Sequence, residues 1–237
     1  MIMTANKQYR LWGGTRRGAL HVRMGQPNQD AYVLRAREDC AFMLVADGVG
    51  AAPLSHIGSH LLCLIASRLS VGCPCDFSMP ELWLQRLQET WRERLPSCEH
   101  HLYSTTCRLM LATDEGVLLA SIGDGGSIAV LHDGVICIGA DKIASYANIT
   151  ESIVEPESRW QWRIFPKDMV QAVFLMSDGV YDDIIPGVHE KFAVEVDALF
   201  RDVSVSRAHC EILKTLRQWG GCGDDKTIIC CQRRCDR

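Results

Sequence analysis

The 237-residue sequence lacks any hydrophobic run that approaches the roughly 18 consecutive apolar residues of a membrane-spanning helix. Its first residues, MIMTANKQYRLWGG, also lack the continuous apolar core of a secretory signal. There is no run of Lys and Arg, and the formal net charge of -4 gives no electrostatic footprint for nucleic acid or an anionic membrane. We therefore expect a cytoplasmic protein whose partners include neither nucleic acid nor a membrane.

Two common catalytic motifs are also missing. The chain has no Gly-x-Ser-x-Gly elbow for a nucleophilic serine and no Gly-x4-Gly-Lys-Ser/Thr loop for nucleotide phosphates. Covalent serine catalysis and P-loop nucleotide binding therefore lack sequence support.

Cysteine, by contrast, is abundant, with 12 residues. Half of them, Cys40, Cys63, Cys107, Cys137, Cys230 and Cys231, lie inside apolar runs, which predicts small buried side chains in a reducing compartment and no disulfide scaffold. The pair Cys73 and Cys75, with Cys98 and the histidines at 100 and 101, offers zinc-type ligands at a non-standard spacing. Loop cysteines without a metal are the favoured interpretation.

The apolar pattern predicts a mixture of helices and strands without a repeated strand-helix-strand rhythm. Helices are expected from Leu54 to Leu69, Pro80 to Leu95, Glu190 to Arg201 and Arg207 to Trp219. Strands are expected at 40–46, 105–112, 117–123, 127–131, 135–139, 172–177 and 227–232, with those from 105 to 139 forming an antiparallel meander. This pattern indicates an α+β layered fold with mostly antiparallel sheets, organised as a single domain over 1–237.

Aspartates beside glycine follow or precede several of these strands. Asp47-Gly48 and Asp178-Gly179 each end an apolar run, and Asp224 lies just before the last strand. Buried strands that present carboxylates at their ends can build a site of hard oxygen ligands for divalent cations. The sequence therefore predicts a metal-dependent enzyme.

These aspartates belong to a longer ordered series of motifs that spans about residues 21–231. Its members are Asn28-Gln29-Asp30-Ala31, Val45-Ala46-Asp47-Gly48-Val49-Gly50, Ser104-Thr105-Thr106, Ile122-Gly123-Asp124-Gly125, Ser177-Asp178-Gly179 and Asp224-Asp225-Lys226-Thr227. The series resembles the signature set of the protein phosphatase 2C (PPM) family, and in particular its compact bacterial branch.

The resemblance implies a four-layer α-β-β-α sandwich, with two mostly antiparallel sheets flanked by helices. It also implies a metal-dependent protein serine/threonine phosphatase that uses a water bridging two Mn²⁺ or Mg²⁺ ions, with a possible third ion. The implied partners are phosphorylated protein substrates and a cognate Ser/Thr kinase, and we expect a monomer.

Carried over by position, the resemblance assigns roles to individual residues. Asp47 would bridge two ions, and the carbonyl of Gly48 would bind one of them. Asp178 and Asp224 would complete the other site, while Asp30 would hold metal-bound water and act with Asp47 in catalysis. Two further residues, Asp124 and Asp182, match acidic positions near a looser third ion.

The chain departs from the family pattern at three positions. Gln29 stands where larger members have a glutamate ligand, Val49 where eukaryotic members have histidine, and Gly25 where many have arginine. His21 could act instead as a general acid or phosphate ligand, and Arg23 could supply charge, but a satisfied polar role is the alternative for each.

The sequence leaves two ambiguities, one in the assignment of neighbouring aspartates and one in the function. Asp225 and Asp183 could exchange roles with their neighbours Asp224 and Asp182. A catalytically silent phosphatase fold used for binding is the alternative function, although a binding module has no need of a full ligand set. A metal-dependent phosphodiesterase or nuclease is a weaker alternative, since histidine ligands and a basic surface are missing.

Overall fold

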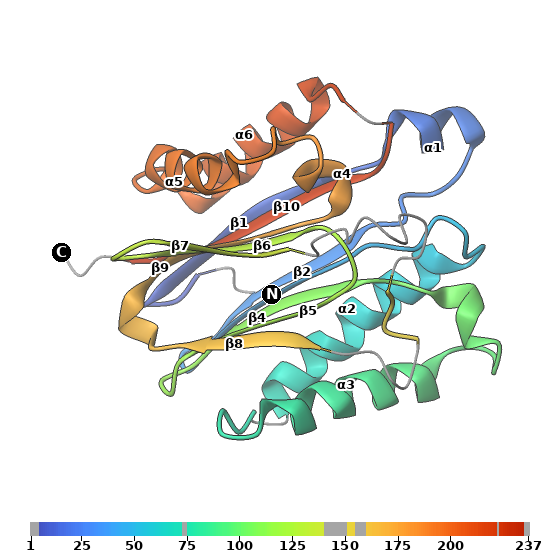
Figure 1. The fold of residues 1–237 in the computed structure, drawn as a ribbon, viewed down its shortest axis with the longest axis horizontal. Coiled ribbons are helices and arrows are strands. Elements are labelled where there is room, and N and C mark those ends of the chain that lie inside the picture. The colour runs from blue at the N-terminus through green and yellow to red at the C-terminus, as the bar shows by residue number, and fades with distance from the viewer. Residues whose placement is uncertain (1–4, 73–74, 140–150, 155–159, 222, 235–237) are drawn as a thin grey trace.

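The computed structural model describes residues 5–72, 75–139, 151–154, 160–221 and 223–234, within which ten strands form two five-stranded sheets. The sheets lie face to face, and helices cover the outer face of each (Figure 1). This arrangement confirms the α-β-β-α sandwich that the resemblance implied.

All neighbouring strands within each sheet are antiparallel. In the order of pairing, the first sheet contains β1 (Tyr9–Arg16), β10 (Lys226–Arg233), β9 (Val170–Met176), β6 (Gly126–Leu131) and β7 (Val135–Gly139). The second contains β2 (Ala31–Ala36), β3 (Ala41–Ala46), β4 (Cys107–Ala112), β5 (Val117–Ile122) and β8 (Gln161–Phe165).

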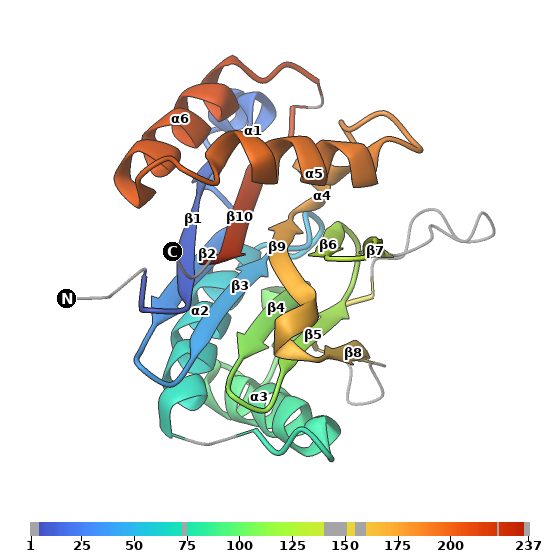
Figure 2. The same ribbon diagram turned by 90° about the vertical axis from the view of Figure 1, so that its left-hand side faces the viewer.

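Two pairs of helices form the outer layers (Figures 1 and 2). The second sheet is covered by α2 (Ser55–Gly72) and α3 (Pro80–Arg94), and the first by α5 (His189–Phe200) and α6 (Val205–Gln218). The shorter elements are α1 (Ala19–Met24), α4 (Asp178–Tyr181), η1 (His100–Tyr103) and η2 (Lys167–Met169). None of the described helices is both long and apolar enough to cross a membrane.

The central strands are buried on both faces, which explains their continuous apolar character. In β3, Phe42 and Leu44 pack into the core beneath α2 and α3, whereas Met43 and Val45 pack into the core between the two sheets. A third core lies between the first sheet and the helices α5 and α6. Since successive side chains in a strand point to opposite faces, both sets must be apolar here.

The predicted helices correspond to α2, α3, α5 and α6, but the predicted meander is wrong. Strands β4 and β5 pair within the second sheet, whereas β6 and β7 pair within the first. The turn through Gly123, Asp124 and Gly125 carries the chain from one sheet to the other instead of closing a hairpin. The elements β1, β2, β8 and α1 had no counterpart in the predicted pattern.

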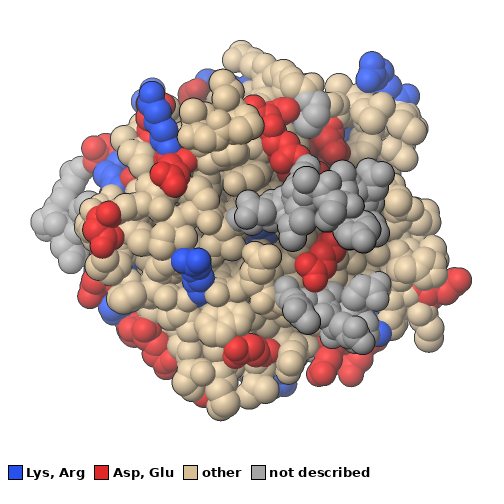
Figure 3. Space-filling model, in the orientation of Figure 1, with Lys and Arg blue, Asp and Glu red and all other residues tan. Residues whose placement is uncertain are grey.

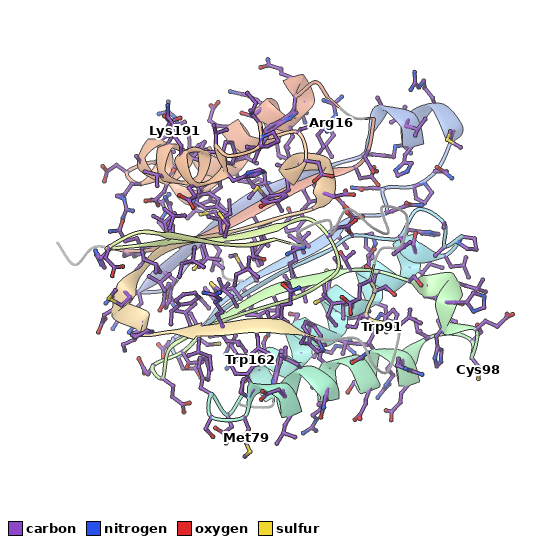
Figure 4. All side chains as sticks on the ribbon, in the orientation of Figure 1. Arg16, Met79, Trp91, Cys98, Trp162 and Lys191 are labelled. Carbon is purple, nitrogen blue, oxygen red and sulfur yellow. The ribbon has the colours of Figure 1, made fainter. Side chains whose placement is uncertain are left out.

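Eight of the described cysteines carry free thiols, namely Cys40, Cys63, Cys98, Cys107, Cys137, Cys210, Cys230 and Cys231. Five of the six cysteines expected inside the core are buried, but Cys137 is exposed, because β7 is an edge strand. Cys75 precedes α3 and Cys98 follows it, and Figure 4 shows Met79 and Cys98 near opposite ends of that helix. A helix of 15 residues is about 22 Å long, so Cys75 and Cys98 do not share a metal site. Cys73 lies outside the described residues.

Charged residues are mixed on the face shown in Figure 3. Among the described residues on this face, Lys and Arg lie singly between acidic and uncharged groups, without a continuous basic patch.

Helix α2 approaches the segment after α3 closely at Gly58. A Cβ atom at this position would lie 2.0 Å from the backbone oxygen of Tyr103, and the Gly58 carbonyl accepts a 3.0 Å hydrogen bond from Trp91 Nε1. The contact therefore requires glycine for reasons of space.

We expect Gly58→Ala to lower the free energy of unfolding by about 1–3 kcal/mol, because the added methyl group overpacks this contact. Gly72→Ala, in the same helix, is the matched control, since a Cβ there meets nothing within 4 Å. The control should be neutral or stabilising by up to about 1 kcal/mol. Urea unfolding of both variants measures the difference, and equal stabilities would contradict the prediction.

Candidate metal centre

The antiparallel sheets bring the predicted site residues to one end of the sandwich, at the right in Figure 1. Asp30 lies just before β2 and Asp47 just after β3, while Asp178 follows β9 and Asp224 precedes β10. Asp124 lies in the turn between β5 and β6. Because neighbouring strands run in opposite directions, one strand ends where the next begins, and these five positions share one edge.

A cleft of about 500 Å³ opens at this edge. It includes all the predicted metal-binding positions except Asp30, which is buried, and it also includes the predicted catalytic residue His21. The lining residues are Leu20, His21, Met24, Gln26, Gln29, Asp47, Gly48, Val49, Gly50, Thr106, Asp124, Asp178, Gly223 and Asp224.

Asp30 is buried at the junction of the two sheets, with 1% of its surface exposed. Its Oδ2 accepts hydrogen bonds from Ser177 Oγ at 2.8 Å and Thr227 Oγ1 at 2.6 Å, both of which belong to the opposite sheet and its loop. Its Oδ1 is buried and has no hydrogen-bond partner. Burial raises the pKa of this carboxyl from 3.8 to about 7, with the nearby Asp225 and Asp178 adding to the effect.

The backbone of Asp47 is held on both sides by the Ser-Thr-Thr motif. Its carbonyl accepts hydrogen bonds from the Thr106 amide at 2.7 Å and Thr105 Oγ1 at 2.9 Å, and its own amide donates to Thr106 Oγ1 at 3.1 Å. The carboxyl group is thereby left to the cleft. The motif residues therefore fix the direction of the proposed bridging ligand.

Electrostatic repulsion among the carboxyl groups is strong at this edge. Burial, followed by the charges of Asp30 and Asp178, raises the pKa of Asp47 well above its ordinary value. Burial, followed by Asp124, raises the pKa of Asp178 from 3.8 to about 6. A cluster that resists ionisation in this way is stabilised by a bound cation, which offsets the shared charge.

The structure distinguishes Asp224 from Asp225. Asp225 is 2% exposed, and its two oxygens each accept a 2.6 Å hydrogen bond, one from the Gly18 amide and one from the Gln29 amide. The side chain of Asp224 is 49% exposed and lines the cleft. Asp225 therefore holds two chain segments together, and this supports the choice of Asp224 as the ligand.

His21 lies between these two aspartates. Its Nδ1 is 2.9 Å from Asp225 Oδ2, and its Nε2 is 4.0 Å from Asp224 Oδ1. His21 is buried on the inner side of α1 yet lines the cleft. Of the two candidates from the sequence, His21 lines the cleft, whereas Arg23 is exposed and is not part of the cleft lining.

The helix α4, which begins at Asp178, is held from behind by Lys226. The buried Lys226 ammonium donates to the Gly179 carbonyl at 2.7 Å and to Asp183 Oδ2 at 2.6 Å. A Cβ at Gly179 would lie 2.0 Å from the Asp225 carbonyl oxygen, so glycine permits this close approach. Asp183 is engaged in this ion pair, which leaves Asp182 exposed outside the cleft lining.

Three positions where the chain departs from the family pattern also lie at or beside the cleft. Gln29 is buried and lines the cleft, and its backbone carbonyl accepts a 2.6 Å hydrogen bond from Ser59 Oγ. Val49 also lines the cleft, whereas Gly25 ends α1 with a left-handed φ of 68°. A neutral amide at Gln29 offers a weaker cation ligand than a carboxylate.

The roles of several residues at the site were not predicted from the sequence. Ser177 and Thr227 were noted only as parts of motifs, and their bonds to Asp30 were not foreseen. Arg108 and Lys226 were missed as supporting residues, although a single charge at an apolar strand was a detectable signal.

The residues fit a divalent cation. The cleft gathers hard oxygen donors from four strand ends, the carboxyl groups repel one another, and Asp30 Oδ1 is a buried acceptor without a partner. The ligand atoms of His21, Asp224 and Asp225 also lie within 4.8 Å of one another, but both oxygens of Asp225 already accept backbone amides. The main cation site is therefore better built from the cleft carboxylates.

Comparison with known sequences agrees with this geometry. The sequence profile of the family described as Protein phosphatase 2C matches residues 17–218. No curated protein matched the chain in the corresponding sequence comparison.

Solved structures share the fold at low sequence identity. A bacterial serine phosphatase has a TM-score of 0.71 and 16% identity, with 96% of this chain and 98% of that chain covered. The serine/threonine phosphatase Stp1 from Staphylococcus aureus has a TM-score of 0.70 and 15% identity, with 100% and 98% covered. The catalytic domain of PstP, solved in complex with 2 manganese ions, has a TM-score of 0.66 and 16% identity, with 96% and 99% covered.

We expect the metal-free protein to become less stable as pH rises from about 4 to about 7. The pKa values of Asp30 and Asp178 are raised from 3.8 to about 7 and about 6, so the folded state binds more protons than the unfolded state in this window. The free energy of unfolding therefore falls with increasing pH. Urea unfolding of chelator-treated protein across this range measures the trend.

The control for this pH dependence is Asp30→Asn, which keeps an acceptor oxygen but removes the titrating group. The difference in the free energy of unfolding between wild type and this variant should change with pH across this window. Added Mn²⁺ should restore the stability that the metal-free wild-type protein loses near neutral pH. A wild-type profile that is flat, or rises with pH, contradicts the prediction.

Proposed function

Because the chain belongs to the protein phosphatase 2C family, and is thereby a serine/threonine phosphatase, we propose that the carboxylate cleft is its active site. The observation that supports this proposal is the convergence of Asp47, Asp178 and Asp224 beside the buried Asp30. The phosphatases of this family are metal-dependent and act on phosphorylated proteins.

We propose that Asp47, Asp178 and Asp224, with the carbonyl of Gly48, hold two divalent ions, and that Asp124 contributes to a third. Manganese or magnesium suits this oxygen-rich set. Bound divalent cations supply a water nucleophile near neutral pH and offset charge on a phosphoryl group. Residues of this chain orient the water and donate a proton to the leaving group, as described next for Asp30 and His21.

Asp30 acts behind the cleft in this proposal. Ser177 and Thr227 occupy its Oδ2, so that only Oδ1 remains to orient a water molecule. This geometry supports the water-holding role that the resemblance assigned to it.

His21 is the proposed proton donor to the leaving group. Its Nδ1 lies 2.9 Å from Asp225 Oδ2 without forming a hydrogen bond, and its Nε2 lies on the side of Asp224. An imidazole that lines the cleft can deliver a proton to the serine or threonine oxygen as the phosphorus-oxygen bond breaks.

Asp47→Asn and Asp178→Asn should each reduce Mn²⁺-dependent hydrolysis of a phosphothreonine peptide by about 100-fold or more, because each removes a ligand charge worth several kcal/mol in the transition state. The measurement is kcat/KM with circular dichroism to confirm folding. Asp133→Asn, in the exposed β6–β7 turn, is the matched control and should retain wild-type activity.

Wild-type rates in Asp47→Asn would show that the ligand assignment is wrong. A wild-type protein that binds Mn²⁺ but hydrolyses neither a phosphothreonine peptide nor an aryl phosphate would instead favour the catalytically silent alternative.

His21→Gln should slow hydrolysis of the phosphothreonine peptide by about 100-fold or more but affect p-nitrophenyl phosphate much less, because nitrophenolate leaves without a proton. The ratio of kcat values for the two substrates measures the effect. His209→Gln, on α6 and outside the cleft, should leave the ratio unchanged. Equal slowing of both substrates in His21→Gln would refute the proton-donor role.

The remaining features of the proposal come from the sequence alone. We propose one catalytic domain over 1–237, a monomeric state, a cytoplasmic location and a cognate Ser/Thr kinase that phosphorylates the same substrates.

A further inference from the structure

Arg108 is a buried cation near the start of the otherwise apolar strand β4. It is 1% exposed and lies on the same face of the strand as Met110 and Ala112, which belong to the core between the two sheets. Burial lowers the pKa of its guanidinium to about 10, so the side chain stays charged at neutral pH. A charge in such a place is costly unless its donors are well used.

The donors of Arg108 are directed mainly at the turn that carries Asp124. Nε donates to the Asp124 carbonyl at 2.9 Å, and Nη2 donates to the Gly123 carbonyl at 2.7 Å. Nη1 makes longer contacts with Ser127 Oγ at 3.5 Å and the Ile138 carbonyl at 3.4 Å. The two short bonds therefore both go to the crossing between β5 and β6.

This crossing has a backbone that requires support. Gly123 and Gly125 have φ values of 90° and 98°, in the left-handed region that favours glycine. Glycine on both sides of Asp124 leaves the turn with many alternative conformations in the absence of other contacts. A Cβ at Gly125 would lie 2.9 Å from Arg108 Nε, so the guanidinium fits directly against the turn.

The two carbonyls that Arg108 holds belong to the peptide groups on either side of the Asp124 Cα. Fixing both peptide planes fixes both backbone dihedral angles of Asp124, and with them the direction of its Cβ. The planar fork of arginine suits two neighbouring acceptors in a way that a lysine ammonium does not. In this conformation Asp124 lines the cleft together with Asp47 and Asp178.

We propose that Arg108 is a positioning residue that holds the Asp124 carboxylate at the metal cleft. This inference rests on the proposed role of Asp124 as a cation ligand. Arg108 itself is buried behind the turn and is not among the cleft-lining residues. Its effect on the centre is therefore indirect, through the backbone of the turn.

The competing explanation is that Arg108 only links the two sheets. In that case its loss would lower the stability of the fold, and any effect on the metal centre would be independent of Asp124. A double-mutant cycle separates the two explanations, because residues that act through one another show non-additive effects.

The experiment measures Mn²⁺ binding to metal-free protein by calorimetry and electron paramagnetic resonance, together with urea unfolding. The variants are Arg108→Met, Asp124→Asn and the double variant. We expect Arg108→Met to weaken the Asp124-dependent binding step by about 10- to 100-fold, the range typical of residues that orient metal ligands. The double variant should bind Mn²⁺ no more weakly than Asp124→Asn.

Two further variants guard against a folding defect. Arg108→Lys keeps the charge but not the fork, so we expect it to fold and still to weaken the same step; it replaces Arg108→Met in the cycle if that variant does not fold. Met110→Leu changes a buried neighbour on the same face and should alter stability without altering Mn²⁺ binding.

The proposal is overturned if Asp124→Asn leaves Mn²⁺ binding unchanged, if neither Arg108 variant weakens it, or if the effects of Arg108 and Asp124 multiply in the double variant. Because the readout is binding and not turnover, these outcomes are distinct from failure of the proposed function. A protein that binds Mn²⁺ without hydrolysing phosphopeptides would still show whether Arg108 acts through Asp124.

Discussion

Repulsion among carboxyl groups at one edge of the sandwich is the constraint that the rest of the structure must accommodate. Without cations, Asp30, Asp47 and Asp178 all have raised pKa values, so the same charges that suit metal binding oppose folding. The backbone around them is correspondingly well supported. Arg108 donates to two carbonyl groups of the turn that carries Asp124. Lys226, the second buried cation, donates to the Gly179 carbonyl in helix α4, which begins at Asp178. Fold stability and cation affinity are therefore coupled properties of one cluster.

The doubled aspartates show how this support is divided. In the pair Asp224 and Asp225, the second residue is buried and accepts two backbone amides, while the first reaches the cleft. In the pair Asp182 and Asp183, the second is paired with Lys226 and the first is exposed. One carboxylate of each pair thus stabilises the local chain path, while its neighbour is the more exposed of the two. An exchange of roles within either pair would break buried hydrogen bonds.

Much of this centre was predictable from the sequence, because a strand end marked by Asp-Gly is a local signal. The four-layer fold was predicted from the resemblance of the ordered motifs to a known family. The long helices were predicted from the helical spacing of their apolar residues. Other parts depend on contacts between distant segments. The edge strand β8 is partly exposed and only five residues long, α1 has only six residues, and the Gly123 to Gly125 turn resembles a hairpin turn. The partners of Arg108 lie 15 or more positions along the chain, so its role could not be derived from local pattern.

The pairing of β1 with β10 has a consequence for the order of events during synthesis. Tyr9 pairs with Arg233 and Arg16 pairs with Lys226. Strand β1 therefore cannot pair with β10 until more than 200 further residues have been synthesised. Asp30 and Gln29 likewise require Thr227 and Asp225. Contacts of such long sequence separation form slowly, since most of the chain must be ordered to close them. A ribosome-bound chain that has not yet exposed β10 therefore has neither a complete first sheet nor an assembled cleft, and both form only after β10 has been synthesised.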